Sequence, residues 1–541
     1  MKVQASLLSL AIASTLAVAA APADAAVSLK SAAIARADLL IGGNANLLRR
    51  APADVLVAKD AVVDAKGTEH VRYNRTWNGL PVIGGDFVVH SRNGKLSSVS
   101  QTLTSAQRPS LRAQVSRDQA IVEAGAHFGT QFFGAPTART VVYARNTVPV
   151  LAHEVVFNGI KADQTPTEMH YFVDARNGKI LDQWDGVNTA KPGPGGGGGS
   201  CTPAVGIGKT LTEGNVTLNT SLCGSSYSMV DTTRGGGATH NMAMKTIGMG
   251  NVFTASSNTW GNNLVTNSQT VGADAQYGIA TTWDYYLNVH NRHGIDGAGT
   301  GAITRVHYGR NYQNAFWSDG CYCMTFGDGD NGATIYPLVA IDVAGHEMSH
   351  GVTSRSAALV YSGESGGLNE ATSDIFGTMV EYYASNAADP GDYVMGEKLF
   401  PNNADMKKAI RWMFKPSLDK ASADCYSSSV GSLDVHYSSG VANHFYYLLA
   451  EGAVVPSGFG AGTWANLTPA KLVCNGNTAL AGIGRDKASK IWYLALTVYM
   501  TSTTNYAGAR SATLSAAAEL YGNGSAEYNA VAAAWSAVSV S

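Results

Sequence analysis

The sequence is poor in charged residues and in cysteine. Asp, Glu, Lys and Arg make up 14% of its 541 residues, and the net charge is −2, which gives no electrostatic basis for binding nucleic acid. Hydrophobic residues make up 45%, which excludes a disordered chain. The 60 glycines follow no G-X-Y repeat, which excludes collagen. Beyond the first 25 residues no apolar run is long enough to span a bilayer, so we expect no membrane anchor.

The first residues have the pattern of an export signal. Lys2 precedes an apolar run over residues 5–21, and the small-x-small sequence Ala23-Asp24-Ala25 follows. This pattern predicts a secretory signal peptide over residues 1–25 and an extracellular mature protein. The alternative is a short membrane anchor, but serines and a threonine interrupt the apolar run, which is marginal for spanning.

All six cysteines lie at residue 201 or later. An even number of cysteines in an exported chain favours disulfides. Proximity in the sequence suggests the pairs Cys201–Cys223 and Cys425–Cys474. The closely spaced Cys321 and Cys323 are a weak signal for a thiolate metal site, and their role stays open.

The length predicts several domains. Short β-branched runs separated by Asn93-Gly94 and by Asn177-Gly178 predict β-hairpins, and residues 116–128 predict a helix. The Gly/Pro-rich stretch 191–200 predicts a flexible boundary where the chain is cut. We divide the chain into a signal peptide (1–25), two small α+β modules (26–108 and 109–187), a linker and processing region (188–200), a lobe that is β-rich at first and helical from about residue 336 (201–355), and a helical lobe (356–541).

A metal-binding pattern begins at His346. Residues 346–350 read His-Glu-Met-Ser-His. On a helix, two histidines four residues apart share one face and can direct ring nitrogens at one metal ion, while Glu347 stays off the metal and reaches a bound water. Residues 336–353 permit a helix, because Pro337 would lie in its first turn. The alternative is a buried helix whose two histidines are hydrogen-bonded to other side chains.

A third ligand is available in the segment Gly366-Gly-Leu-Asn-Glu370-Ala-Thr-Ser-Asp374. Glu370 can bind the metal, while Asp374, one helical turn later, can accept a hydrogen bond from the N–H of a ligand histidine and fix its tautomer. Two histidines and one glutamate leave a fourth position for water, which is the pattern of a catalytic zinc site.

Together these two motifs resemble the thermolysin family of secreted zinc endopeptidases, and in particular its elastase-like branch from Gram-negative bacteria. Nineteen residues separate His350 from Glu370, as in that family. The likeness extends over most of residues 201–541, and residues 27–187 resemble the family's two-module propeptide. The resemblance implies an α+β fold: a thermolysin-like two-lobed catalytic domain, with a β-rich N-terminal lobe and a helical C-terminal lobe, preceded by small α+β propeptide modules.

The resemblance also implies roles for single residues. By their place in the motifs, His346, His350 and Glu370 match the zinc ligands, Glu347 the general base and Asp374 the carboxylate behind a ligand.

Other segments match the substrate side of the family's site. Tyr361 and His436 match the two donors to the oxyanion, and Asp434 would orient His436. The matches to substrate-binding positions are the strand residues Asn314 and Ala315, the carbonyl-binding Arg411, and the pocket residues Leu338, Val343 and Ile410.

The resemblance further implies structural calcium. Asp342, Glu381 and Asp389 match acidic calcium ligands, with a backbone carbonyl near Gly391. Val394 stands where thermolysin has one of the acidic residues for a second ion, so we expect one calcium ion here.

The function implied is a secreted, zinc-dependent endopeptidase with one catalytic zinc ion. It would hydrolyse internal peptide bonds, prefer a bulky hydrophobic residue just after the cut, and use a zinc-bound water activated by Glu347. Its partners would be protein or peptide substrates and its own propeptide, which acts as intramolecular chaperone and inhibitor of the precursor. We expect a monomer.

Two other functions compete with this interpretation. A zinc aminopeptidase shares His-Glu-x-x-His but needs an acidic anchor for the substrate amine, such as a Gly-x-Met-Glu-Asn motif, and the sequence has none. A secreted binding protein could keep the metal site without catalysis. The joint presence of Glu347, Tyr361 and His436 disfavours the binding protein, because a structural site needs none of them.

Overall fold

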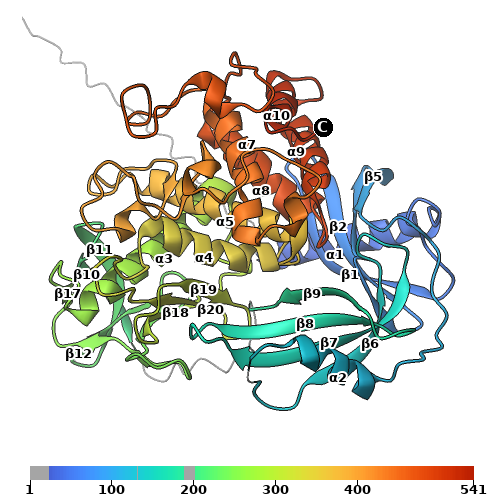
Figure 1. The fold of residues 1–541 in the computed structure, drawn as a ribbon, viewed down its shortest axis with the longest axis horizontal. Coiled ribbons are helices and arrows are strands. Elements are labelled where there is room, and N and C mark those ends of the chain that lie inside the picture. Colours follow the sequence, from blue (N-terminus) through green and yellow to red (C-terminus); the bar gives the residue numbers. More distant parts are fainter. Residues whose placement is uncertain (1–22, 131, 188–200) are drawn as a thin grey trace, which may run out of the picture.

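The computed structural model describes residues 23–130, 132–187 and 201–541. The predicted signal peptide lies almost wholly outside these ranges, and the predicted linker, residues 188–200, lies outside them. The chain up to residue 187, which we call the N-terminal region, packs along one side of the part formed by residues 201–541 (Figure 1). Within the described ranges, no helix is both long and apolar enough to cross a membrane.

One nine-stranded sheet forms the frame of the N-terminal region. Its strands are β1 (Asp54–Val63), β2 (Thr68–Trp77), β3 (Leu80–Ile83), β4 (Phe87–Arg92), β5 (Lys95–Gln101), β6 (Thr137–Tyr143), β7 (Val150–Ile160), β8 (Pro166–Asp174) and β9 (Ile180–Asp185). Neighbouring strands are antiparallel except β3 and β6, which pair in parallel through Val82–Val142 and Ile83–Tyr143. The two predicted modules therefore share one sheet.

Local sequence explains several elements of this region. Asn93 and Gly94 both have positive φ angles (52° and 69°) and join β4 to β5 in the predicted hairpin. Helix α2 (Arg117–His127) occupies the predicted helical segment, and Ser116 with Gln119 forms a capping box at its start. Helix α1 (Ala23–Gly42) packs on β1 and β2.

Residues 201–355 begin with two small sheets. The first contains β10 (Thr202–Lys209), β11 (Asn215–Cys223), β12 (Ser226–Ser228), β16 (Thr254–Ala255) and β17 (Thr259–Gly261). The second contains β13 (Val230–Asp231), β14 (Gly237–Asn241), β15 (Asn251–Val252), β18 (Ile303–Tyr308), β19 (Ala315–Ser318) and β20 (Cys323–Gly327). Between β17 and β18 runs the 23-residue helix α3 (Ser268–His290), so helical structure begins well before residue 336, where the sequence placed it.

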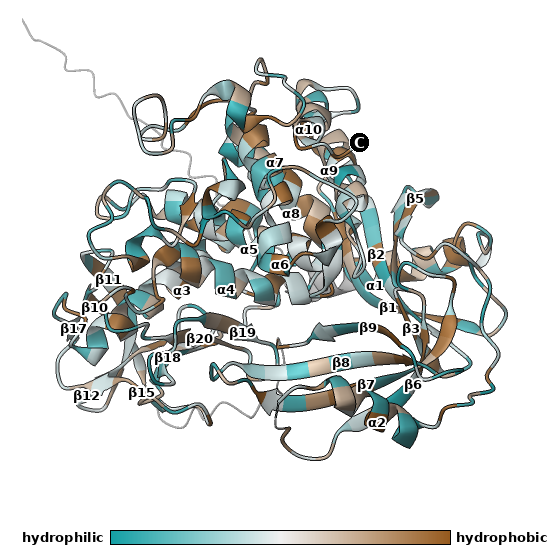
Figure 2. Ribbon diagram, in the orientation of Figure 1, coloured by the Kyte–Doolittle hydropathy of each residue, from teal (hydrophilic) through white to brown (hydrophobic). Residues whose placement is uncertain are grey.

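The rest of the chain is mostly helical. Its elements are α4 (Ile341–Ser354), α5 (Gly363–Ala384), β21 (Val394–Met395), β22 (Arg411–Trp412), α6 (Val435–Ser438), α7 (Gly440–Glu451), α8 (Arg485–Leu494), α9 (Tyr506–Tyr521) and α10 (Ala526–Ala537), with short 3₁₀ turns and one π-helical segment (Ala495–Tyr499) between them. Hydrophobic residues recur along these helices (Figure 2). They join residues of the β-rich lobe, such as Trp260 and Trp317, in one continuous core with Trp492 and Trp535.

Helix α4 starts later than the sequence suggested. It begins at Ile341. Residues before Ile341 hydrogen-bond to other segments of the chain instead of forming a first helical turn. The backbone N–H of Tyr336 donates to the carbonyl of Leu399, and that of Leu338 to the carbonyl of Gly327. Tertiary hydrogen bonds thus overrule the local preference for a proline-led first turn.

Helices α4 and α5 cross at two glycines. A Cβ atom on Gly377 of α5 would lie 2.4 Å from the carbonyl oxygen of Asp342 on α4, and one on Gly345 would lie 2.9 Å from the Cα of Gly377. Real Cβ atoms do not come this close to backbone, so glycine is required for the crossing. The crossing brings the histidines of α4 within reach of the carboxylates of α5.

The two disulfides expected from proximity, Cys201–Cys223 and Cys425–Cys474, are both formed. Cys321 and Cys323 are bonded to each other. The first bridge fastens the start of β10 to the end of β11, and the second joins two loops of the helical lobe.

We predict that Gly377→Ala destabilises residues 201–541 by forcing α4 and α5 apart. Overpacking at a rigid contact costs about 1–3 kcal/mol, so the melting temperature should fall by several degrees. Gly460→Ala is the matched control, because a Cβ there meets its nearest neighbour at 3.8 Å. Equal melting temperatures of the two variants would refute the close crossing.

Candidate active site

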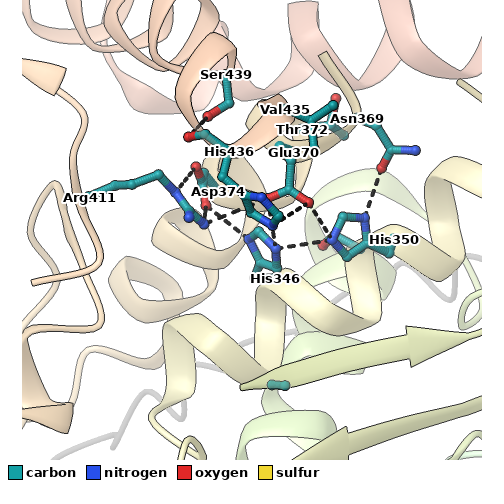
Figure 3. A network of polar contacts seen from close by, with 12 residues as sticks. His346, His350, Asn369, Glu370, Thr372, Asp374, Arg411, Val435, His436 and Ser439 are labelled. Atoms are coloured by element: carbon teal, nitrogen blue, oxygen red, sulfur yellow. Dashed lines mark hydrogen bonds and ion pairs between the residues drawn. The ribbon is translucent and has the colours of Figure 1, made fainter. Parts of the chain in front are cut away.

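Three buried side chains converge where α4 and α5 cross. Nε2 of His346 lies 3.0 Å from Nε2 of His350 and 3.6 Å from Oε2 of Glu370. Nε2 of His350 lies 3.4 Å from Oε1 of Glu370. Figure 3 shows the two rings, from successive turns of α4, pointing toward the carboxylate on α5. The structure thus brings together the three residues that the sequence predicted as metal ligands.

The other nitrogen of each ring has an acceptor. Nδ1 of His346 lies 2.9 Å from Oδ1 of Asp374, and Nδ1 of His350 lies 2.8 Å from Oδ1 of Asn369. Both Nδ1 atoms therefore donate a hydrogen bond, which leaves lone pairs on the two Nε2 atoms that face each other. Asn369 was not among the predicted site residues, although it directly precedes Glu370.

This donor set fits a metal ion. Oε2 of Glu370 is buried and accepts no hydrogen bond, and two imidazole lone pairs lie beside it. Such an arrangement is unfavourable without a cation between the atoms. Two imidazole nitrogens and one carboxylate, with no fourth protein ligand, match the ligands of a catalytic zinc ion.

A second layer of polar contacts fixes these ligands. The guanidinium of Arg411, on β22, donates to both oxygens of Asp374 at 2.6 and 2.5 Å, and Nδ2 of Asn443 donates to the same carboxylate at 2.7 Å. Burial opposes ionisation of Asp374, but Arg411 and His346 outweigh it and lower the pKa of Asp374 to about 2. Asp374 is therefore a permanent acceptor for His346. The predicted contact of Arg411 with substrate stays a prediction.

Glu347 lies beside the cluster without a partner of its own. Its side chain is buried, its Oε2 accepts no hydrogen bond, and it lines the same cavity as the two histidines. Burial raises the pKa of Glu347, while His346 and His350 counteract that effect. A free carboxylate next to a metal-type donor set is available to accept a proton from a bound molecule.

Tyr361 and His436 stand on the other side of the cluster. The Tyr361 hydroxyl donates to Oε1 of Glu370 and lies 3.3 Å from Nε2 of His436. Asp434 holds His436 by accepting from its Nδ1 at 2.7 Å and from its backbone N–H at 3.0 Å. The charge of Glu370 and the hydrogen bond to Asp434 raise the pKa of His436. His436 is half exposed, so its Nε2 can reach a bound ligand.

A cavity of about 530 Å³ opens over these residues. All six residues predicted to bind substrate line it, namely Asn314, Ala315, Leu338, Val343, Ile410 and Arg411. Phe316, from the same predicted substrate-pairing strand, also lines it, as does Met395, which was not predicted. The polar cluster thus lies at one wall of a cavity that has hydrophobic side chains on the other.

The N-terminal region closes part of this cavity. Its lining includes Lys161, Thr165, Gln183, Asp185 and Val187. Lys161 pairs with Asp185 at 2.8 Å, which ties the β7–β8 turn to the end of β9.

A further contact of the N-terminal region lies at the rim. Arg145 donates to the carbonyl of Ser362 and, at 3.0 Å, to the hydroxyl of Ser365, and it pairs with Asp182 at 2.6 Å. The start of α5 is thereby fastened to β9. No sequence pattern marked Arg145 for this contact.

A second buried cluster of carboxylates lies at the other end of the same helix pair. Asp342 of α4, Glu381 of α5 and Glu397 offer ligand atoms within 4.8 Å of one another. Both oxygens of Asp389 are buried without a hydrogen-bond partner, although Nζ of Lys398 lies 3.4 Å from one of them. Burial and the charges of neighbouring carboxylates raise the pKa values of Glu381 and Glu397, and burial with the charge of Asp389 raises the pKa of Asp342 to about 7.

This cluster corrects one argument from the sequence. The expectation of a single calcium ion rested on Val394 in place of an acidic residue, but Glu397 supplies a carboxylate from three residues further on. Glu213, from the β-rich lobe, and Asp392 also join the cluster, and neither was predicted. Gly391 lies in the same loop, between Asp389 and Asp392. The count of one ion stays a prediction without that support.

Comparisons with known proteins agree with the geometry. Residues 205–354 match the family model described as thermolysin metallopeptidase, catalytic domain, and residues 357–540 match the thermolysin metallopeptidase, alpha-helical domain. Residues 54–103 match the fungalysin/thermolysin propeptide motif.

Individual relatives extend over most of the chain. The transglutaminase-activating metalloprotease of Streptomyces mobaraensis is 46% identical over 90% of this chain, which spans 61% of that protein's length. The thermolysin of Alicyclobacillus acidocaldarius subsp. acidocaldarius is 35% identical to this chain. The match covers 88% of this chain and 84% of the length of that thermolysin. The precursor of protealysin, a metalloproteinase from Serratia proteamaculans, is a similar solved structure with 28% identity and a TM-score of 0.44, over 56% of this chain and 87% of that one. The chain belongs to the thermolysin family of metallopeptidases, and its N-terminal region carries the propeptide motif of that family.

Proposed function

We propose that the chain is the precursor of a secreted, zinc-dependent endopeptidase that hydrolyses internal peptide bonds. The observation that carries this proposal is the convergence of His346, His350 and Glu370 on one wall of a cavity, with the unpartnered Glu347 beside them. The export signal, the calcium count and the monomeric state stay predictions from the sequence.

The three converging residues would hold zinc. A zinc ion bound there supplies Lewis acidity, which acidifies a water molecule and polarises the peptide carbonyl. Glu347 accepts a proton from the attacking water and delivers it to the amine that leaves. Asp374 and Asn369 hold the two histidine rings in the tautomer that presents Nε2.

Two polar side chains beside the metal-type ligands stabilise the charge that develops during the attack. The Tyr361 hydroxyl and Nε2 of His436 donate toward the carbonyl oxygen as it becomes negative. Asp434 keeps the His436 ring in place through Nδ1. These donors bind the transition state more tightly than the substrate. Their loss therefore lowers kcat more than it weakens substrate binding.

The hydrophobic part of the cavity selects the substrate. Leu338 and Val343 are each 4% exposed, and with Ile410 they form an apolar surface beside the ligands. A pocket of this kind favours a bulky hydrophobic residue, which we assign to the position just after the cut.

The N-terminal region would keep the precursor inactive. Residues of the β7–β8 turn and of β9 and the residues after it line the cavity where a substrate has to enter. Cleavage within residues 188–200 would free this region and open the cavity, which explains why it precedes the metal-binding motifs in the chain.

The overall proposal is tested by removing and restoring metal. We expect the processed enzyme to cut an unstructured protein at internal bonds, to lose this activity on zinc chelation, and to regain it with zinc when calcium is present. Sequencing the fragments should show bulky hydrophobic residues at the new N-termini. Trimming from the ends alone would indicate an aminopeptidase, and a folded, zinc-loaded protein without cleavage would indicate a binding module.

The role of Glu347 predicts a separation of binding from catalysis. Glu347→Gln should keep one zinc ion at the candidate active site but lose nearly all hydrolysis, because the amide cannot accept the proton. Elemental analysis and peptide hydrolysis measure the two properties on one sample. Glu527→Gln, at the start of α10, is the control for the same chemical change. A fully active Glu347→Gln variant would contradict the assignment.

The role of His436 predicts a graded loss. Removal of one donor to an oxyanion costs roughly 100–1000-fold in turnover, so His436→Ala should lower kcat by that factor while KM changes little. His293→Ala removes an exposed histidine away from the cavity and should leave kcat unchanged. A kcat of His436→Ala within tenfold of the parent would rule out the donor role.

A further inference from the structure

A third group of metal-type ligands lies where the N-terminal region packs against the helical lobe. Asp64, just after β1, His70 on β2 and Glu519 on α9 offer ligand atoms within 4.8 Å of one another. Some 450 residues of sequence separate His70 from Glu519. The group lies at the contact between β2 and α9. None of its residues belongs to the candidate active site or to the carboxylate cluster around Asp342.

The Nε2 atom of His70 points into this group and has no hydrogen-bond partner. The residue is 2% exposed, and its Nε2 is buried without a hydrogen bond. Nε2 lies 3.5 Å from Oε1 of Glu519, which is too long for a good hydrogen bond. A buried ring nitrogen left in this state is rare, and it points to a ligand between the two atoms.

A chain of hydrogen bonds behind His70 accommodates the tautomer that metal binding needs. Nδ1 of His70 lies 2.7 Å from Nδ1 of His90, and Nε2 of His90 lies 2.9 Å from the hydroxyl of Ser100. In that tautomer His90 donates to Ser100 through Nε2 and accepts a hydrogen bond from Nδ1–H of His70, so Nε2 of His70 keeps its lone pair. A metal-bound histidine is held in this way by donating its other N–H.

The two carboxylates are also positioned from behind. Oδ1 of Asp64 accepts from the backbone N–H groups of Lys66 and Thr68 at 2.9 and 2.6 Å. The hydroxyl of Tyr499 donates to Oε2 of Glu519. Among the described residues no lysine or arginine forms an ion pair with either carboxylate, and Nζ of Lys66 donates instead to the backbone carbonyls of Glu519 and Leu520.

Arg72 is engaged in the same way. Its guanidinium donates to the backbone carbonyl of Met500 at 2.8 Å. Two carboxylates and an imidazole lone pair are thus left facing one another across the contact between β2 and α9.

We propose that Asp64, His70 and Glu519 bind a divalent cation of the zinc class, which clamps the N-terminal region onto the helical lobe. One imidazole with two carboxylates suits zinc better than calcium or magnesium, which take oxygen ligands. The ion joins ligands from both sides of the interface, so it binds only while the N-terminal region is docked. Metal binding and docking therefore strengthen each other. The inference does not depend on the catalytic roles proposed above.

The test counts bound zinc in the intact full-length chain. Glu347→Gln serves as the background, so that self-cleavage cannot remove the N-terminal region, and only chains that gel mobility shows to be intact are analysed. After dialysis against dilute zinc chloride with calcium in excess, elemental analysis should show one equivalent less zinc per chain in His70→Gln and in Glu519→Gln. Gln at 519 still accepts from Tyr499, which preserves the fold.

The matched control is His153→Gln, which alters another buried, hydrogen-bonded histidine of the N-terminal region. It should retain the full zinc content. Equal zinc content in the background and in both cluster variants would overturn the proposal, even if the variants melt at lower temperature.

Release of the N-terminal region gives an independent readout. In the processed parent enzyme, added zinc should slow dissociation of the N-terminal region on a sizing column, and Glu519→Gln should abolish this dependence on zinc. A dissociation rate that is independent of zinc in the parent would show that the contact is structural only, and would overturn the clamp.

Discussion

The close crossing of α4 and α5 is the contact on which the rest of the site depends. Two facing glycines, Gly345 and Gly377, let the helix backbones meet, and the polar residues along each helix then lie opposite one another. The stripe on α4 is Asp342, His346 and His350, and the stripe on α5 is Glu370, Asp374 and Glu381. Buried polar stripes of this kind are stable only when their charges are neutralised. Arg411 does this for the middle of the crossing, and cations suit its two ends.

The N-terminal region makes two different kinds of contact with the lobes. At the cavity, β9 and the β7–β8 turn line the candidate active site, and the turn makes polar contacts with the β-rich lobe. At α9 it offers β2 and β4, whose buried histidines and arginine face backbone carbonyls and Glu519. The first contact lies at the cavity and the second lies away from it.

Much of the site could be read from the sequence because its residues occur in two short motifs. His346, Glu347, His350, Glu370 and Asp374 all lie on helices, where spacing fixes which residues share a face. Contacts between distant segments could not be read in this way. Glu397 reaches the carboxylate cluster through a 3₁₀ turn, and Arg145 reaches Ser362 from the turn after β6; neither spacing nor composition encodes such meetings. The start of α4 was missed because tertiary hydrogen bonds decide it. Helix α3 was missed although Asn267 and Asn291 mark its two ends.

The parallel pairing of β3 with β6 has a consequence for how the N-terminal region is dismantled. A cut in the connection between its two halves, after β5, would leave the halves paired in one sheet through β3 and β6. A single cut between the halves therefore leaves the sheet in one piece. Unfolding from the edges would begin at β1, β5 or β9, each of which pairs with one neighbouring strand only.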